Sequence, residues 1–499
     1  MGANLKKQTA LSKYAPYDKE LVEKNLRAAR ENFSHKIVVL DDDPTGIQTV
    51  HGIYVYTDWS IESIREGFLS EQQMFFILTN SRSFSEEQTK EVHETIAENI
   101  KVVAKETGLD YIVISRGDST LRGHYPQETE TLRLKLDQED APIDGEIIIP
   151  FFAEGGRYTI DNIHYVAQDD ILVPAGQTEF AKDKTFGYQY SHLGRWVQEK
   201  TKGRYLEDHI AYISLDELRK LNYKAITDKL IGTQCFQKVI VNAISYEDVK
   251  VFVTALLHAY QAGKRFIYRS AAALTKVIGD ISDKPLLSQE ELIDQNNNNG
   301  GLIIVGSHVK KTSDQLAKLR TRTDIQFIEF NQHLVVDDKA FRAEIERVIT
   351  RTETNLFAGY TTAVYTRRDR LDFDKLTTLE TSNTSLLYEN LSEEKKKALE
   401  LDLSVRISNA VTEIVKRLTI RPRFLIAKGG ITSSEIGTTS LGVKKALVLG
   451  QILPGIPVWK TGEESKFPGM SYVIFPGNVG TVDDLLHAVE KMEWKEDEL

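Results

Sequence analysis

The sequence contains a single cysteine among 499 residues and no long uncharged apolar run. One thiol can build neither a disulfide framework nor a cysteine-ligated metal site, so Cys235 is expected to be a half-buried core residue in a reducing compartment. No stretch approaches the ~18 apolar residues that a membrane span requires. The first 30 residues also lack a continuous apolar core, which argues against a signal peptide and makes the cytoplasm the expected location.

A basic stripe is missing as well. The chain has 63 Lys and Arg residues against 73 Asp and Glu residues, a formal net charge of −10, and its basic residues are scattered. This pattern argues against a nucleic-acid partner and favours a small ligand. No internal repeat of fixed period is visible, and the only low-complexity patch is the run of asparagines at 296–299.

The length and the 41% hydrophobic content are those of an ordinary globular protein with two or three domains. Short runs of Val, Ile, Phe and Tyr alternate with longer segments of helical apolar spacing along almost the whole chain. This alternation is typical of βα units. We therefore predict an α/β fold with two domains, each a mostly parallel sheet flanked by helices, and a cleft between them.

The expected elements follow from these patterns. Strands are predicted at 36–40, 52–56, 74–78, 111–114, 146–149, 239–241, 266–268, 302–305, 325–329, 362–365, 424–427, 445–449 and 471–475. Helices are predicted at 85–107, 246–262, 311–322, 333–351, 392–418 and 482–492.

The clearest linker is the polar, turn-forming stretch that ends in Asn-Asn-Asn-Asn-Gly-Gly before a new apolar strand. It divides the chain into a helical N-terminal extension at 1–30, a first domain at 31–285, the linker at 286–301 and a second domain at 302–499.

Three consecutive carboxylates follow the first strand, in the run Asp41-Asp42-Asp43-Pro44-Thr45-Gly46. Like charges repel, and such a cluster persists only where a cation, a hydroxyl-rich ligand or a donor group neutralises it. The alternative is an acidic surface turn closed by Pro-Thr-Gly.

A second cluster follows the strand at 111–114. It places Asp118, Ser119, Thr120 and Arg122 between two glycines, and arginine offers a planar fork that grips a carboxylate or phosphate. Loops at the carboxyl ends of parallel strands share one edge of a sheet, so the two clusters should form a pocket for a polyhydroxy acid. Alternatively, Arg122 pairs structurally with an aspartate and Asp118 caps a helix.

Two weaker signals lie further along the first half. Arg157 follows a glycine pair after the strand at 146–149, and Arg269 stands at the end of the strand at 266–268. Either arginine could supply a fixed cation to the same pocket. A simple turn and a solvated rim residue are the respective alternatives.

Glycine-bearing strand ends mark the second half. The run Lys428-Gly429-Gly430-Ile431-Thr432 joins a strand to a helix start, where backbone N–H groups can cradle nucleotide phosphates, although it lacks Walker A spacing. Similar turns carry Gly306-Ser307 and Gly477-Asn478-Val479-Gly480. Each turn alone is common in proteins without ligands, and the three together predict an edge that accommodates a nucleotide.

Taken together, these motifs resemble the four-carbon acid sugar kinase family, with its Asp-Asp-x-x-Thr-Gly and Asp-Ser-Thr-Leu-Arg-Gly loops. The match spans nearly the whole chain, from the turn at 42–46 to the turn at 477–480. The resemblance implies an ATP-dependent kinase that phosphorylates the terminal hydroxyl of threonate, erythronate or 3-oxo-tetronate. The first domain would bind the sugar acid, and the second would bind ATP with Mg²⁺.

The resemblance and the motifs together assign the site residues. Asp42 is the first choice for the catalytic base and Asp118 the second. The residues expected to bind the sugar acid are Asp41, Asp43, Thr45, Ser119, Thr120, Arg122, Arg157 and Arg269. Those expected to bind ATP are Ser307, Lys428, Gly429, Gly430, Ile431, Thr432, Gly477, Asn478 and Gly480. The metal ligands are not assigned.

The chain departs from the family pattern at three points. The first turn reads Asp-Asp-Asp-Pro-Thr-Gly where many members have Asp-Asp-Phe/Leu-Thr-Gly, which leaves the preferred acid open. The family's Ser-Gly-Gly-x-Thr loop begins here with Lys428, and the turn at 475–480 lacks the lysine of its family counterpart. We hypothesise that Lys428 restores the missing positive charge beside the phosphates.

Two other functions fit parts of the pattern. Asp41, Asp43 and Thr45 match the Asp-x-Asp-x-Thr motif of haloacid dehalogenase-like phosphatases, and Leu78-Thr79-Asn80 resembles their second motif, but this interpretation leaves the last 200 residues unexplained. A sugar-acid sensor without catalysis is the non-enzymatic alternative. The expected partners are a sugar acid and ATP, with no nucleic acid or membrane, and a homodimer is possible.

Overall fold

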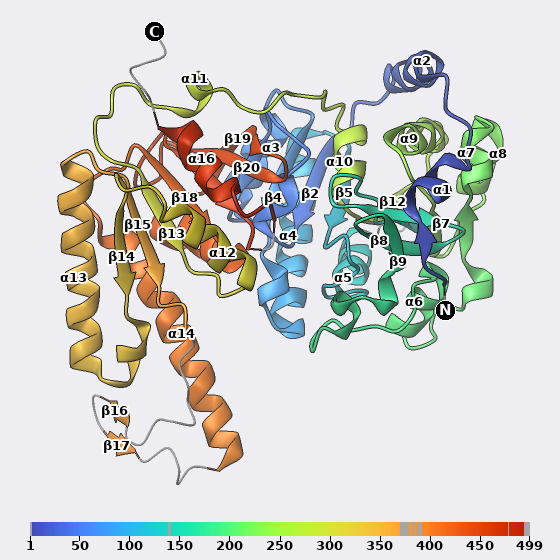
Figure 1. The fold of residues 1–499 in the computed structure, drawn as a ribbon. Coiled ribbons are helices and arrows are strands. Elements are labelled where there is room, and N and C mark those ends of the chain that lie inside the picture. Colours follow the sequence, from blue (N-terminus) through green and yellow to red (C-terminus); the bar gives the residue numbers. More distant parts are fainter. Residues whose placement is uncertain are drawn as a thin grey trace. The chain divides into compact units, whose positions relative to one another are not determined.

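The computed structural model describes residues 2–137, 141–369, 379–381, 384–386, 392–477 and 479–493. The chain divides into two compact units, Met1–Lys284 and Pro285–Leu499 (Figure 1). Each unit contains a mostly parallel sheet with helices on its faces, which confirms the predicted α/β class. Within the described ranges, no helix is both long and apolar enough to cross a membrane.

The main sheet of the amino-terminal unit has eight parallel strands in the order β10-β11-β6-β12-β5-β2-β4-β3. Its strands are β2 (Lys36–Asp41), β3 (Tyr54–Tyr56), β4 (Met74–Leu78), β5 (Tyr111–Arg116), β6 (Gly145–Ile149), β10 (Ala211–Ile213), β11 (Gln237–Val241) and β12 (Phe266–Ser270). The central strands are continuous apolar runs because helices cover both faces of a parallel sheet.

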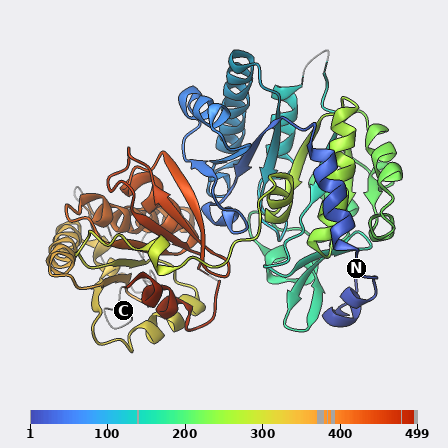
Figure 2. The ribbon, with the colours of Figure 1, turned by 90° about the horizontal axis from the view of Figure 1, so that it is seen from above.

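Ten helices belong to this unit within the described residues. They are α1 (Lys7–Ser12), α2 (Lys19–Arg30), α3 (Ile61–Leu69), α4 (Glu86–Thr107), α5 (Gln127–Leu136), α6 (Leu193–Lys200), α7 (Leu215–Arg219), α8 (Tyr223–Ile231), α9 (Tyr246–Gln261) and α10 (Ala272–Ile278). The helix α4 connects β4 to β5, and α9 connects β11 to β12, so the two connections run in opposite directions along the sheet. Right-handed crossovers therefore place these two helices on opposite faces of the sheet (Figure 2). The long helix α4 starts at a capping box formed by Ser85 and Gln88 and ends at Gly108, which is left-handed.

A small antiparallel sheet, β1-β9-β8-β7, was not predicted. It consists of β1 (Leu5–Lys6), β7 (Arg157–Ile160), β8 (Ile163–Gln168) and β9 (Ile171–Pro174). The β7–β8 hairpin turns through Asp161 and Asn162, which both have positive φ angles. Such two-residue turns are a known hairpin signal, so the Asp-Asn pair between apolar runs could have revealed it.

The sheet of the carboxy-terminal unit has the order β19-β20-β21-β18-β13-β15-β14. Its strands are β13 (Leu302–Val305), β14 (Gln326–Phe330), β15 (Thr362–Thr366), β18 (Phe424–Lys428), β19 (Lys445–Leu453), β20 (Ile456–Thr461) and β21 (Ser471–Phe475), and a separate ladder joins β16 (Leu379–Thr381) to β17 (Thr384–Leu386). The β19–β20 and β20–β21 pairs are antiparallel and the other pairs of the main sheet are parallel.

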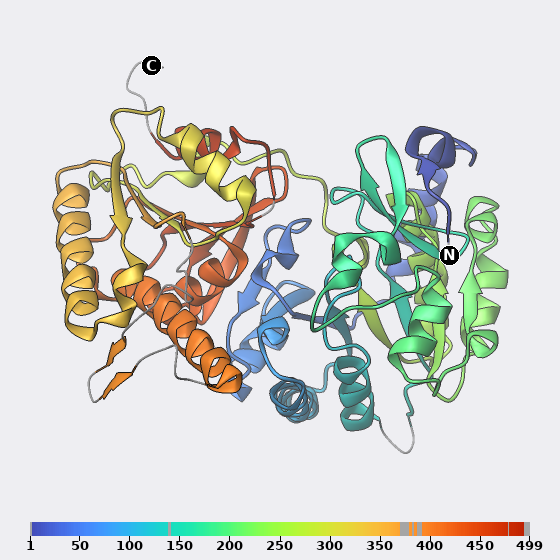
Figure 3. The same ribbon diagram turned by 60° about the horizontal axis from the view of Figure 1, so that its bottom comes forward.

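The helices of this unit are α11 (Gln289–Leu292), α12 (Lys310–Leu319), α13 (Asp338–Phe357), α14 (Glu393–Arg417), α15 (Gly430–Glu435) and α16 (Asp484–Met492). The helices α12 and α16 lie side by side and bury Leu316, Leu319 and Leu485 against Ile303 and Phe475 (Figure 3). This packing gives the unit a hydrophobic core of its own.

Each predicted strand overlaps an observed one, and each predicted helix overlaps a helix. The helix expected at 333–351 is α13, which starts at Asp338 and ends at Phe357. It starts later than predicted because 332–336 forms a 3₁₀ turn and Asp337 caps its first turn. The expectation for Cys235 is wrong. Its side chain is exposed in the turn that precedes β11, where its φ angle is +54°.

Candidate functional sites

The carboxyl ends of four neighbouring strands gather charged side chains in the amino-terminal unit. Asp41 ends β2, Arg116 ends β5, and Arg269 is the second-to-last residue of β12. Arg82 belongs to the short 3₁₀ turn after β4. The parallel register brings these residues to one edge of the sheet, as the sequence predicts for its first two loops.

Two arginines that the sequence analysis did not select neutralise the aspartate run. Arg82 donates to Asp42 through Nη2 (2.6 Å to Oδ1) and Nε (3.2 Å to Oδ2), and to Asp43 through Nη1 (3.2 Å). Arg116 donates through Nη1 to Oδ1 of Asp41 at 3.2 Å. Arg116 ends β5, next to β2, so the strand-end rule that located the aspartates could have located it too. Arg82 stands in the 3₁₀ turn beyond the end of β4, where no motif marks it.

The three adjacent carboxyls titrate differently. Burial raises the pKa of Asp41 to about 7, because Arg116 and the N–H of Asp43 offset only part of the desolvation. Burial also raises the pKa of Asp42 in spite of Arg82. For Asp43, burial acts in the same direction, but Arg82 and the hydroxyl and N–H of Thr45 lower its pKa below the ordinary value.

Gly46 is required by close approach to Asp41. A Cβ at this position would lie 2.0 Å from Oδ2 of Asp41. That oxygen is buried and has no hydrogen-bond partner in the described ranges. The turn therefore folds tightly over a carboxyl that is held in the interior.

The second predicted loop presents Asp118 as an ionised acceptor. Nε of Arg122 donates to its Oδ2 at 2.8 Å, and the hydroxyl of Thr120 donates to the same oxygen. Burial would raise the pKa of Asp118, but Arg82 and Arg122 together hold it well below its usual range. The alternative in which Arg122 pairs with an aspartate is therefore correct, because its partner is Asp118. The alternative in which Asp118 caps a helix is not, because α5 begins after Pro126.

Three side chains from distant segments hold the backbone of this loop. Nε2 of His164 donates to the carbonyl of Ser119 at 2.8 Å, the hydroxyl of Tyr188 donates to the carbonyl of Thr120 at 2.7 Å, and Nη2 of Arg269 donates to the carbonyl of Arg122 at 2.8 Å. Burial lowers the pKa of His164 to about 4, so the ring is neutral at pH 7. The loop is therefore fixed before any ligand arrives.

The buried Arg269 explains the two glycines that flank the loop. A Cβ on Gly117 would lie 2.3 Å from Cζ of Arg269, and Gly123 has a φ angle of +122°. Arg269 also donates to Oε2 of Glu128 at 2.6 Å. Its charge is balanced within the protein, so it supports the loop and is not a solvated rim residue.

Arg157 is the arginine of this cluster whose charge is not balanced by a carboxylate. Within the described part of the chain no acidic oxygen lies at ion-pair distance from it, and its Nε is buried without a hydrogen-bond partner. Its guanidinium lies over the ring of Phe180, 5.8 Å from the centroid, and Arg122 lies over the same ring at 5.1 Å. A carboxylate ligand would satisfy this cation.

A cavity of about 550 Å³ occupies the corresponding edge of the carboxy-terminal unit. Ser307, Thr366 and the turn at 429–432 line it from the ends of β13, β15 and β18. Ile407, Ser408 and Val411 of α14 form another wall. Ser408 donates to Oε2 of Glu435 at 2.6 Å. This apolar helical wall was not predicted, because nothing in the sequence distinguishes it from an ordinary core-facing helix.

Glycines let the three predicted turns approach each other. A Cβ on Gly306 would lie 2.3 Å from Oγ1 of Thr432, and one on Gly477 would lie 2.9 Å from Oγ of Ser307. Gly429 has a φ angle of +128°. These close approaches bring the hydroxyls of Ser307 and Thr432 to one edge of the sheet, whereas the N–H groups of Gly306 and Ser307 donate to the carbonyl of Lys428 at 3.3 Å.

Three of the remaining predicted residues differ in their outcome. Gly480 has a φ angle of +86° and packs beside Asp484 at the start of α16, away from the cavity lining. Asn478 lies outside the described residues. Ile431 lines the cavity and is mostly exposed.

The geometry does not support contact between Lys428 and phosphate. Its ammonium is fully buried, donates to the carbonyl of Pro476 at 2.6 Å and lies 3.8 Å from the centre of the Phe475 ring. Burial lowers its pKa to about 7. Lys428 therefore supports the backbone of the 475–477 turn.

Arg368 is a cation beside the cavity that the sequence analysis missed. It donates through Nη2 to the carbonyl of Ser307 at 2.6 Å and to the hydroxyl of Ser313 at 3.0 Å. Its Nη1 is buried and has no hydrogen-bond partner in the described ranges. Its position two residues after the end of β15 is the sequence feature that could have identified it as a site residue.

Two family models match the chain. Residues 37–278 match a sugar-binding N-terminal domain, and residues 302–485 match a nucleotide-binding C-terminal domain. The chain belongs to the four-carbon acid sugar kinase family. The nucleotide-binding match covers much of the carboxy-terminal part that the phosphatase interpretation left unexplained.

The family fold recurs in solved structures. Haemophilus influenzae protein HI1011 is 17% identical, with a TM-score of 0.59, and the match covers 91% of this chain and 100% of that chain. A Salmonella typhimurium LT2 protein, provisionally described as a tRNA synthase, is 14% identical, with a TM-score of 0.64 and coverage of 92% and 100%. A Bordetella bronchiseptica domain of unknown function, a domain-swapped dimer with bound citrate, is 17% identical, with a TM-score of 0.37 and coverage of 91% and 98%. No curated protein matches.

Proposed function

We propose that this protein is an ATP-dependent kinase that phosphorylates the terminal hydroxyl of a four-carbon sugar acid of the threonate, erythronate or 3-oxo-tetronate type. The observation that supports it most is the pairing, in one chain, of a fixed aspartate and hydroxyl loop beside the unbalanced Arg157 with a glycine-lined cavity in a nucleotide-binding domain. The cytoplasmic location and the homodimer remain predictions.

On the sugar-acid side, Arg157 and Arg122 bind the substrate carboxylate. Asp118 accepts hydrogen bonds from the substrate hydroxyls, and the hydroxyl oxygens of Ser119 and Thr120 accept as well. Asp42 accepts the proton of the attacking hydroxyl, because its raised pKa makes it a stronger base than Asp118. Asp41, Asp43, Thr45 and Arg269 shape the site without contacting the reacting atoms.

On the nucleotide side, backbone N–H groups of Gly430 and Gly477 face the phosphates, with the hydroxyls of Ser307 and Thr432. The N–H of Gly429 instead donates to the carbonyl of Phe475 at 2.8 Å, so this glycine shapes the turn. The apolar face of α14 receives the base. Magnesium prefers oxygen ligands and takes most of them from nucleotide phosphates and water, and these two hydroxyls fit that preference. When bound, Mg²⁺ neutralises charge on the transferring phosphoryl group.

A coupled assay of ADP release, run with threonate, erythronate and 3-oxo-tetronate, tests this proposal. A kinase releases ADP only when an acid is present. Phosphate release from phosphorylated acids would instead indicate a phosphatase, and thermal stabilisation by the acids without turnover would indicate a sensor.

Matched variants refine the same assay. Arg157→Gln should raise the KM for the acid at least about tenfold and leave the KM for ATP unchanged, because it removes a charge-assisted hydrogen bond. Arg27→Gln, on the exposed side of α2, is the control. Equal effects of Arg157→Gln on both KM values would contradict the assignment.

A further inference from the structure

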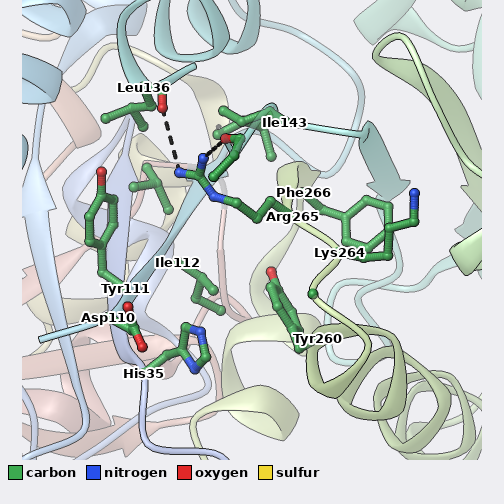
Figure 4. A pocket seen from close by; sticks show the side chains of 14 residues that line it. His35, Asp110, Tyr111, Ile112, Leu136, Ile143, Tyr260, Lys264, Arg265 and Phe266 are labelled. Atoms are coloured by element: carbon green, nitrogen blue, oxygen red, sulfur yellow. Dashed lines mark hydrogen bonds between the residues drawn. The ribbon is translucent and has the colours of Figure 1, made fainter. Parts of the chain in front are cut away.

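A second cavity, of about 290 Å³, lies where the strands of the amino-terminal sheet begin (Figure 4). Its lining comes from the first residues of β5 and β12, the end of α5 and the last turn of α9 with the residues after it. The six residues of β5 lead from Tyr111, at this cavity, to Arg116, in the aspartate cluster, a span of roughly 16–20 Å. The cavity is thus separate from the candidate sugar-acid site.

A guanidinium group lies in the wall of this cavity. Arg265 donates to the backbone carbonyls of Leu136 (Nη2, 3.5 Å) and Ala141 (Figure 4). Arginine carries five N–H donors, so these two bonds to described residues leave three that no other described residue accepts. In the described ranges no carboxylate is at ion-pair distance from Arg265, whereas the neighbouring Lys264 is paired with Asp144 at 2.8 Å.

Two further polar groups of the lining lack partners. Nδ1 of His35 and the hydroxyl of Tyr111 are both buried, and neither has a hydrogen-bond partner among the residues that the structure describes. Buried polar groups in native proteins nearly always have partners, so two exceptions beside a guanidinium with no carboxylate partner among the described residues are consistent with a bound polar molecule. Asp110 is exposed at the rim, where solvent screens its charge.

The rest of the lining is apolar. Ile112, Val113, Ile143 and Phe266 contribute hydrocarbon surface, and the ring of Tyr260 faces the cavity with its hydroxyl bonded to that of Tyr268 at 2.5 Å. An apolar cavity with a few convergent polar groups is the usual form of a small-molecule site. Its volume limits the ligand to a small molecule.

We propose that this cavity binds a small organic acid, whose carboxylate is held by Arg265 and whose apolar body packs against Ile112 and Tyr260. The hydroxyl of Tyr111 donates a further hydrogen bond to the carboxylate. The proposal concerns binding alone and holds whether or not the chain is a kinase.

Three carboxylate probes and one neutral analogue test it on the full chain by isothermal titration calorimetry. The probes are benzoate, cyclohexanecarboxylate and 3-methylbutanoate, and benzyl alcohol has the ring of benzoate without its charge. At least one acid should bind with a Kd below about 10 mM, and benzyl alcohol should bind at least about tenfold more weakly than benzoate. Failure of all three acids, or equal affinity for benzyl alcohol, would overturn the proposal.

Variants locate the bound probe. Arg265→Gln should weaken binding about tenfold or more. Tyr111→Phe should weaken it less and leave thermal stability unchanged, because it removes a hydroxyl that has no partner among the residues the structure describes. Arg157→Gln, at the other edge of the sheet, is the matched control and should bind the probe as the natural chain does. If Arg157→Gln weakened binding and Arg265→Gln did not, the acid would occupy the sugar-acid site and the inference would be wrong.

Discussion

Asp41, Asp42 and Asp43 show how three adjacent carboxyls acquire different properties from their contacts. Asp43 accepts from a guanidinium, a hydroxyl and an N–H, so its charged form is stabilised. Asp41 has one oxygen without a partner within the described ranges, so burial dominates. Perturbed carboxyls of this kind are frequent at functional sites, and also in structural ion-pair networks.

The first prediction concerns the pH dependence of stability at Asp41. Its pKa is about 7 in the folded protein and near 3.8 in the unfolded chain, so the unfolded chain loses the proton first as pH rises. The stability that protonated Asp41 contributes is therefore fully present below about pH 4 and is lost on rising through pH 7. Asp41→Asn cannot lose a proton, so its stability relative to the natural chain should increase from pH 4 to pH 8, by up to about 4 kcal/mol.

Urea unfolding at pH 4, 6 and 8 measures this difference. The exposed Glu71→Gln is the matched control. A difference between Asp41→Asn and the natural chain that stays constant with pH would show that Asp41 is ionised throughout this range.

The second prediction separates a buried ion pair from an exposed one. Arg82→Gln leaves the buried carboxylate of Asp42 without its two hydrogen bonds, and we expect a loss of about 2–3 kcal/mol in the free energy of unfolding. Arg65→Gln breaks the more exposed pair with Glu106, at 2.8 Å against 2.6 Å for Arg82 and Asp42, and should cost less than about 1 kcal/mol. Urea unfolding at pH 7 compares the two variants. Equal losses would mean that solvent screens Arg82 as fully as Arg65.

The loop at 118–122 is an element whose shape depends on residues far away in the chain. The three donors to its carbonyls, His164, Tyr188 and Arg269, lie 45, 68 and 147 residues from their acceptors. Preorganisation of this kind reduces the ordering that substrate binding must impose. It also ties the antiparallel hairpin β7–β8, through His164, to the candidate site.

The third prediction tests this support. Tyr188→Phe leaves the carbonyl of Thr120 without its donor, so we expect a loss of about 1–2 kcal/mol in stability and a higher KM for the sugar acid, with the KM for ATP unchanged. Tyr212→Phe, which removes a longer 3.3 Å bond to the carbonyl of Glu207, is the matched control. Steady-state kinetics and thermal unfolding give both readouts. A change in KM for ATP as large as that for the acid would contradict a local role.

Local patterns were sufficient to locate the strands and the loops that follow them. The apolar runs before Asp41, Asp118 and Gly429 identified three strand ends, and their parallel arrangement identified the shared edges. What depended on three-dimensional contacts was missed. Arg82 stands in a turn with no motif, and Lys428, hypothesised to lie beside the phosphates, is bonded to the carbonyl of Pro476. A sequence gives residue types at strand ends, and only the packed structure shows which charges are already paired.

Each of the two units has its own hydrophobic cores. One cluster joins Val38, Phe75 and Ile100 in the amino-terminal unit, and another joins Ile303, Ile426 and Leu485 in the carboxy-terminal unit. Between them, residues 279–288 form no regular secondary structure, and those at 282–286 are exposed. Units with separate cores and an exposed connection are expected to resist unfolding individually.

The last prediction follows from this organisation. Thermolysin cleaves beside exposed apolar side chains, and Leu286 is 41% exposed in the connecting segment, whereas Leu287 and Leu292 are buried in the carboxy-terminal core. Brief digestion of the full chain should therefore cut within 282–286 and give persistent fragments close to the 284 residues of the first unit and the 215 residues (499 minus 284) of the second. N-terminal sequencing and mass spectrometry identify the cut.

Leu286→Asp, which removes the apolar side chain from the exposed segment, should slow cleavage there without changing thermal stability, because that side chain packs in neither core. If the natural chain were instead cut first inside β2 or β18, the strands that carry the two candidate sites would be less stable than the connection, and the division into two independently stable units would be wrong.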